Sequence, residues 1–246
     1  MKPILFSFGA FHLYSYGLSV AVGVLLALFL MTRRAQKEGF PKSDEVLDLA
    51  FAILVWGFVG ARLFYVLQNL SFYASYPLKI FAVWEGGLIF YGGALASILG
   101  FWRTVRKLHL PFWKTLDFIV PYGALAHAFG RIGCFLNGCC YGKACVLSWA
   151  VRFPEVAYRV HPTQLYEAFY DLALFVFLLV RRKRSRFEGE IGLLYFIFYG
   201  MGRYLIEFVR QPAGWMWMGL TSNQWLSAAI IAVSFVLFQS RQRKTR

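Results

Sequence analysis

Residues 3–32 contain no Asp, Glu, Lys or Arg, and the run ends at Arg33 and Arg34. An α-helix needs about 20 consecutive apolar residues to cross the hydrocarbon core of a bilayer, and this run is long enough to supply them. Few folds of a soluble chain can accommodate such a segment. We therefore place a first membrane span at about residues 13–32.

The overall composition agrees with a membrane protein. Apolar residues make up 59% of the 246 residues and charged residues 15%, whereas about 25% charged residues is usual in soluble domains. A soluble protein of this size could not bury so much apolar surface, and disorder requires low hydrophobicity. The net charge of +14 is better explained by cytoplasmic loops and anionic lipid than by a nucleic-acid partner.

Apolar segments recur along the chain, each near the length that a tilted helix needs. We predict an all-α polytopic membrane protein with about seven transmembrane helices, forming a single integral membrane domain over residues 1–246. An outer loop, or small periplasmic head region, is expected at about 134–163. The predicted spans are about 13–32, 46–67, 86–102, 115–133, 164–180, 191–209 and 222–239.

Basic residues orient the predicted helices. They gather after the first, third and fifth spans and in the C-terminal tail, at residues 33–42, 103–114, 181–186 and 241–246. Cytoplasmic loops carry an excess of Lys and Arg. We therefore expect the N-terminus outside and the C-terminus in the cytoplasm, with the most unusual segments of the sequence on the outer side.

Ionisable side chains inside membrane spans are costly and usually functional. Glu167 and Asp171 lie one turn apart at the start of the fifth span. Tyr199, Arg203 and Glu207 follow a spacing of four residues, which places them on one face of the sixth span. The alternative is a buried Arg203–Glu207 pair that only fixes helix packing.

Two glycine-rich stretches interrupt the spans. Residues 130–142 read Gly-Arg-Ile-Gly-Cys-Phe-Leu-Asn-Gly-Cys-Cys-Tyr-Gly, which suits a loop whose backbone approaches a ligand closely. Arg131 and the exposed backbone N–H groups around it could together bind an anion. In a bilayer the obvious anion is a lipid phosphate. The second stretch, residues 84–93, serves either such a site or close helix packing.

Four cysteines fall at positions 134, 139, 140 and 145, and this spacing lacks the C-x2-C pairs of most zinc sites. A zinc site, a disulfide on the oxidising side and free thiols that fill space remain open, and free thiols are the simplest of the three. His161 lies in the segment His-Pro-Thr-Gln-Leu-Tyr-Glu before the fifth span. It could act as a base or have a structural role.

Together these motifs resemble the prolipoprotein diacylglyceryl transferase family, the bacterial membrane enzymes of lipoprotein maturation. Each motif is weak alone, but six in the family order on a seven-span frame are specific. The resemblance covers nearly the whole chain. The motifs are Tyr14–Gly17, Gly60–Arg62, Trp84–Gly93, Gly130–Gly142, His161–Glu167 and the segment from Tyr199 to Pro212.

The resemblance implies transfer of a diacylglyceryl group from phosphatidylglycerol to the lipobox cysteine of a preprolipoprotein, with release of glycerol 1-phosphate. It implies no cofactor and no metal ligand, and we expect a monomer in the bacterial plasma (inner) membrane with its site in the outer half. Guanidinium groups suit phosphate because they bind it in bidentate fashion and stay charged. The candidate catalytic residues are Arg131, Arg203, Tyr91 and His161. The candidate substrate-binding residues are Arg131, Tyr16, Asn137, Gly142, Tyr199, Glu207, Gly86, Gly87, Gly92 and Gly93.

Three positions depart from the family pattern. Cys134 stands where the signature usually has Asn, Cys139 where it has Glu, and Tyr91 where many members have a histidine regarded as a candidate base. A tyrosine, with a pKa near 10, is a better hydrogen-bond donor than base at neutral pH. Two alternatives therefore stay open: a diverged paralogue that acts on another acceptor, and a lipid-binding or transport membrane protein without chemistry.

Overall fold

The computed structural model of the chain describes residues 3–8, 11–212 and 214–245. Residue 246, the last of the basic tail, lies outside them. The chain forms two compact units. Unit 1 comprises Met1–Leu30 with Leu116–Arg246, and unit 2 comprises Met31–Thr115.

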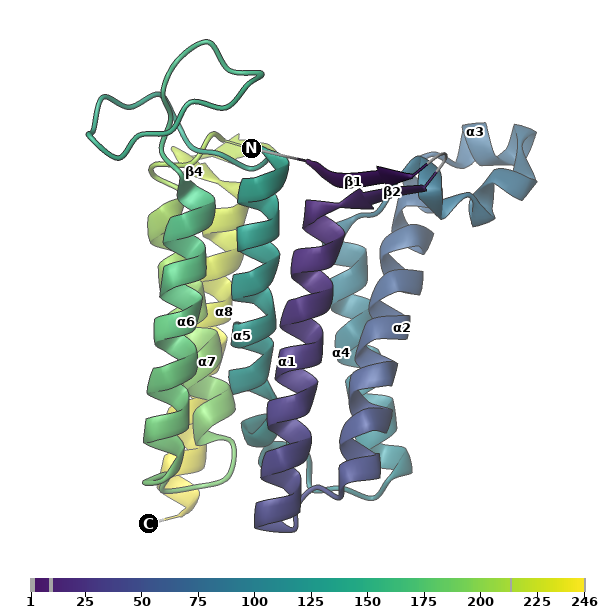
Figure 1. The fold of residues 1–246 in the computed structure, drawn as a ribbon. Coiled ribbons are helices and arrows are strands. Elements are labelled where there is room, and N and C mark those ends of the chain that lie inside the picture. The colour runs from purple at the N-terminus through teal and green to yellow at the C-terminus, as the bar shows by residue number, and fades with distance from the viewer. Residues whose placement is uncertain (1–2, 9–10, 213, 246) are drawn as a thin grey trace. The chain divides into compact units, whose positions relative to one another are not determined.

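Unit 1 is built on long helices joined by short strands and one long loop. At its start, β1 (Ile4–Phe8) pairs antiparallel with β2 (Phe11–Tyr14); before its last helix, β3 (Met216–Trp217) pairs with β4 (Leu220–Thr221). The loop between α5 and α6 lies at the same end of this unit as β4, and α8 ends at the opposite end (Figure 1). The helices are the first part of α1 (Ser15–Glu38), most of α5 (Phe112–Asn137), α6 (Thr163–Arg182), α7 (Glu190–Ile206) and α8 (Ser222–Lys244).

Asp117 on α5 fixes the start of α7. Its carboxylate accepts hydrogen bonds from the backbone N–H of Gly189 at 2.7 Å and of Gly192 at 2.8 Å. The first N–H groups of a helix have no partner within the helix, so this contact satisfies two of them and sets how far α7 extends along α5. An apolar core of Val120, Leu174, Leu178 and Ile191 joins α5, α6 and α7.

In unit 2, α2 (Ser43–Gln68) packs closely against α4 (Phe90–Lys107) through small residues. A Cβ added at Gly60 would lie 2.2 Å from the Cβ of Ala96 and 2.7 Å from the carbonyl oxygen of Gly92. A Cβ at Gly93 would lie 3.0 Å from the carbonyl oxygen of Gly57. Close helix packing therefore accounts for Gly92 and Gly93. This was one of the two alternatives proposed for residues 84–93.

Arg62 holds the segment between these two helices, which contains α3 (Leu70–Ser75), η1 (Pro77–Phe81) and η2 (Val83–Glu85). Its buried guanidinium donates hydrogen bonds to five backbone carbonyl oxygens, those of Lys79, Ile80, Ala82, Gly86 and Gly87. Gly86 and Gly87 have φ angles of 86° and 81°, which favour glycine. Helix α4 consequently begins at Phe90 rather than at the predicted residue 86.

The predicted spans coincide with the long helices of the described residues, and five of these, α1, α2, α5, α6 and α8, are long and apolar enough to cross a membrane. The remaining two have shorter apolar segments, since α4 has three basic residues among its last five and α7 has 17 residues. The chain is thus a mostly helical membrane protein with short strands at β1–β4. Helix α5 continues to Asn137, so the first part of the glycine-rich stretch is helical rather than a loop.

Candidate active site

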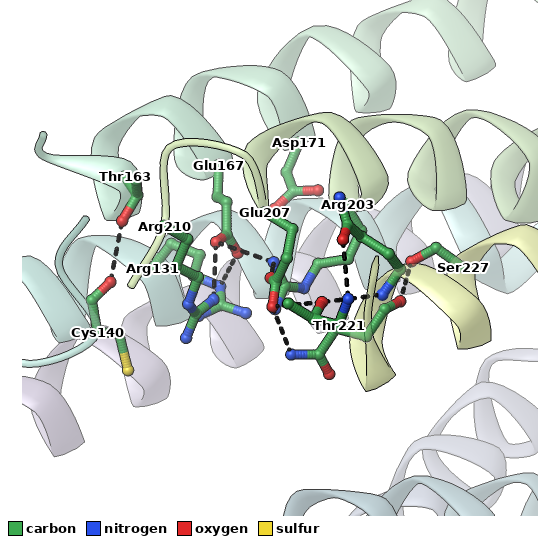
Figure 2. Close-up of polar contacts among 12 residues, drawn as sticks. Arg131, Cys140, Thr163, Glu167, Asp171, Arg203, Glu207, Arg210, Thr221 and Ser227 are labelled. Carbon is green, nitrogen blue, oxygen red and sulfur yellow. Dashed lines mark hydrogen bonds and ion pairs between the residues drawn. The ribbon is translucent and has the colours of Figure 1, made fainter. Parts of the chain in front are cut away.

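Glu167, a buried carboxylate on α6, meets arginines from the ends of two other helices. Arg131 Nε, on α5, lies 2.6 Å from Glu167 Oε2, and Arg210 Nη1, just after α7, lies 3.0 Å from Glu167 Oε1. Arg203 Nη1, on α7, lies 3.9 Å from the same Oε1. Figure 2 shows Arg131 and Arg210 converging on this carboxylate. The structure therefore brings together the two predicted arginines, Arg131 and Arg203, and a third, Arg210, that was not predicted.

Glu207 forms the second anionic centre of the cluster. Its Oε2 lies 2.9 Å from Arg203 Nη1, so the predicted Arg203–Glu207 pair is present. Its Oε1 accepts hydrogen bonds from Thr221 Oγ1 and Asn223 Nδ2, each at 3.0 Å. Both donors belong to the start of α8, so Glu207 joins the end of α7 to α8 as well as pairing with Arg203 (Figure 2).

Three guanidinium groups share two carboxylates in this cluster, because Arg131, Arg203 and Arg210 surround Glu167 and Glu207. A third carboxylate, that of Asp171, lies nearby and pairs with His127. The side chains of the three arginines are each 14–15% exposed, and that of Glu167 is 5% exposed. The arrangement is therefore suited to an anion, and planar guanidinium groups match the oxygens of a phosphate.

A second polar pair lies one turn further along α6. Asp171 Oδ2 is 2.6 Å from Nδ1 of His127 on α5, and the His127 ring packs edge-on against Tyr199 at 5.5 Å between centroids. His127 was not among the site residues predicted from the sequence. His127 could have been found from its position four residues before Arg131, because this spacing places both side chains on the same face of α5.

Gly142 brings the loop between α5 and α6 against the segment that carries Arg210. Its N–H donates to the carbonyl oxygen of His161 at 2.9 Å, and it forms a β-bridge with Arg210. A Cβ at Gly142 would lie 2.5 Å from the carbonyl oxygen of Val209, so the close approach requires glycine. His161 Nδ1 lies 3.3 Å from the hydroxyl group of Tyr166.

The other predicted site residues are divided between the two units. Tyr16 near the start of α1 is 45% exposed and packs beside Gly133 of α5. Asn137 is exposed at the end of α5 and Tyr199 lies one turn before Arg203. The members in unit 2, whose roles at the site stay predictions, are Tyr91, Gly86, Gly87, Gly92 and Gly93.

Three cysteine side chains gather where α5 ends. The sulfur atoms of Cys134, Cys139 and Cys140 lie within 4.8 Å of one another. The cysteines at 134, 139, 140 and 145 are free thiols. Hydrogen bonding with the other two thiols lowers the pKa of Cys140, and the positive charges of Arg210 and Arg131 lower this pKa further.

Comparison with known proteins gives a consistent result. The family model described as prolipoprotein diacylglyceryl transferase matches residues 3–239. The phosphatidylglycerol–prolipoprotein diacylglyceryl transferase of Clostridium tetani (strain Massachusetts / E88) is 34% identical, over 97% of each chain. The protein of the same name from Geobacter sulfurreducens is 37% identical, over 86% of this chain and 83% of the relative. The one from Wolbachia pipientis subsp. Culex pipiens is 33% identical, over 97% and 94%.

Proposed function

This chain belongs to the prolipoprotein diacylglyceryl transferase family, and we propose that it transfers the diacylglyceryl group of phosphatidylglycerol to the lipobox cysteine of preprolipoproteins. The cysteine sulfur attacks the carbon of the diacylglyceryl unit that is bonded to the phosphate oxygen. The new C–S bond forms as the C–O bond to the phosphate breaks, and glycerol 1-phosphate leaves with the bonding electrons. The proton of the thiol passes to water.

The observation that carries this proposal is the convergence of Arg131, Arg203 and Arg210 on Glu167. A displacement at carbon with a phosphate leaving group needs the phosphate held and its growing charge stabilised. Arg131 and Arg203 perform both tasks as bidentate ligands that never lose their charge. Glu167 keeps the mutually repelling guanidinium groups in one place, so the site is organised before the lipid arrives.

Ionisation of the acceptor thiol is the other requirement. A free thiol has a pKa near 8.5, so about a few per cent is thiolate at pH 7. We propose that the positive charges of Arg131 and Arg203 stabilise the thiolate directly. Tyr91 then orients lipid by hydrogen bonding, and His161 is dispensable as a base. Tyr16, Asn137, Gly142, Tyr199 and Glu207 shape the substrate site around the arginines.

The topology forms part of the same proposal: seven spans in the bacterial inner membrane, with the N-terminus outside, the C-terminus in the cytoplasm and the chain acting as a monomer. Arg131 lies in the last turn but one of α5, Arg203 lies in the last turn of α7, and Glu167 lies near the start of α6. The cluster is therefore at the end of unit 1 that carries the outer loop, away from the basic residues 181–186.

Labelling of single cysteines tests this orientation. In a cysteine-free background, we expect a membrane-impermeant thiol reagent to label a cysteine at Asn137 in intact cells. A cysteine at Arg182 should react only after lysis. Labelling at Arg182 before lysis would reverse the orientation.

Reconstitution tests the reaction itself. The purified chain, in vesicles of phosphatidylglycerol, is given a peptide that contains a lipobox cysteine. We expect the peptide to gain one diacylglyceryl unit, with one glycerol 1-phosphate released for each, and vesicles of phosphatidylethanolamine to give no product. Release of glycerol 1-phosphate without a modified peptide would instead support the alternative acceptor, which the departures at Tyr91, Cys134 and Cys139 leave as the second candidate.

A further inference from the structure

The three clustered thiols are unused by the proposed reaction, and their geometry is that of a metal site. Three sulfur ligands around one ion, each at about 2.3 Å, stand about 4 Å apart. The sulfur atoms of Cys134, Cys139 and Cys140 already lie within 4.8 Å of one another. They would therefore have to converge by less than about 1 Å to share an ion.

The surrounding backbone holds this arrangement in place. The carbonyl oxygen of Cys139 accepts a hydrogen bond from Gln164 Nε2 at 2.5 Å, and that of Cys140 accepts one from Thr163 Oγ1 at 3.0 Å. Both donors are buried at the start of α6. Cys134 is buried in the last turn of α5. The three ligands are thus fixed by two helices rather than presented on a free loop.

We propose that Cys134, Cys139 and Cys140 form a binding site for one thiophilic d10 cation, Cu(I). Soft thiolate ligands select Cu(I) and zinc among common metal ions. Zinc almost always takes four ligands in structural sites, whereas three sulfur atoms satisfy a three-coordinate Cu(I) ion. Three thiolates with one monovalent ion carry two negative charges, and the nearby positive charges of Arg210 and Arg131 offset them.

Occupancy of this site would tie the end of α5 to the turn that holds Cys139 and Cys140, whose carbonyl oxygens accept hydrogen bonds from the start of α6. Arg131 lies three residues before Cys134, and Glu167 lies three residues after Gln164. The metal would therefore fix the turn between the two helices that contribute the Arg131–Glu167 pair. This part of the molecule needs no metal for the proposed transfer, so binding can be measured without reference to activity.

Competition for copper tests the proposal on the full-length chain, purified in detergent under reducing conditions. Cu(I) is titrated against bicinchoninate, a chromophoric Cu(I) chelator, with the wild type and single variants. We expect one Cu(I) per wild-type chain and at least 100-fold weaker binding in Cys140→Ser and Cys139→Ser. The matched control Cys145→Ser, which removes the cysteine outside the cluster, should bind as the wild type does.

Several results would overturn the site. These are unchanged affinity in both Cys139→Ser and Cys140→Ser, an equal loss in Cys145→Ser, or stoichiometric binding of Zn²⁺ by a chain that leaves Cu(I) to the chelator. A count of two thiols rather than four in the metal-free, denatured chain purified without reductant would show a disulfide instead. Cys140 is exposed, so the Cys140→Ser variant keeps the test valid if Cys134→Ser does not fold.

Discussion

Glu167 Oε2 lies 2.6 Å from Arg131 Nε, so an ion pair joins the last part of α5 to the start of α6. The other oxygen of the same carboxylate lies 3.0 Å from Arg210 Nη1. An arginine held through Nε still has its terminal N–H groups available for a ligand. Glu167 can therefore orient Arg131 while the two terminal nitrogens of its guanidinium group remain available to bind a phosphate.

We predict that Arg131→Lys and Arg203→Lys each lose most transferase activity while the protein still accumulates. Lysine keeps the charge but loses the planar fork. Loss of one charge-assisted contact of about 3 kcal/mol lowers the rate roughly 10²-fold. Activity per amount of protein in phosphatidylglycerol vesicles measures this, with Arg152→Lys in the exposed part of the loop as the control. Full activity in either variant would remove that arginine from the mechanism.

Glu207→Gln should affect stability more than chemistry. The amide can still accept hydrogen bonds from Thr221 and Asn223, but it loses the ion pair with Arg203, and breaking one partner of a buried pair costs about 3 kcal/mol. We expect a lower melting temperature and a lower protein level, with the remaining protein active. Glu188→Gln, at an exposed position, is the control. A normal melting temperature together with a large loss of specific activity would instead assign Glu207 to the reaction.

The positive charges of Arg131 and Arg203 should make a dedicated general base unnecessary for ionisation of the acceptor thiol. We predict that Tyr91→Phe costs about tenfold or less, the size of one ordinary hydrogen bond, and that His161→Gln and Tyr91→His are tolerated. His127→Gln should likewise leave the pH–rate profile in place, although it removes the contact with Asp171. A thousandfold loss in His161→Gln or His127→Gln, with a shifted pH–rate profile and normal protein level, would identify that histidine as the base.

Arg62→Lys tests the structural role of the buried guanidinium in unit 2. An ammonium group has three N–H donors, too few for the five carbonyl oxygens that Arg62 now serves. We expect a loss of about 3 kcal/mol of stability and faster tryptic cleavage at Lys79. Arg103→Lys, at an exposed position of α4, should leave cleavage unchanged. Equal cleavage rates in both variants would show that Arg62 does not hold this segment.

The sequence predicted where the helices lie because bilayer thickness sets the length of an apolar run. It could not predict where some of them begin and end. Helix α4 starts at Phe90 because Gly86 and Gly87 adopt positive φ angles, which hydropathy does not reveal. Helix α5 continues to Asn137 because the glycine-rich stretch tolerates helix where Gly133 packs against α1.

The site was predictable to the extent that its contacts are local. Arg203 and Glu207 are four residues apart, so their pairing could be read from helical spacing. Contacts between segments far apart in sequence, such as that of Arg131 with Glu167, required the fold. The approach of three thiols depends on the turn after α5, where Cys140 has a φ of 62°, and this conformation leaves no sequence pattern.

The mass of a reporter lipoprotein in a bacterium depleted of its own transferase tests the proposed function most directly. When this chain is expressed there, we predict that growth recovers and that the reporter gains one diacylglyceryl unit. The Arg131→Lys chain, present in the membrane at the same level, should support neither. A reporter that stays unmodified despite normal amounts of the wild-type chain in the membrane would show that the chain does not carry out this transfer.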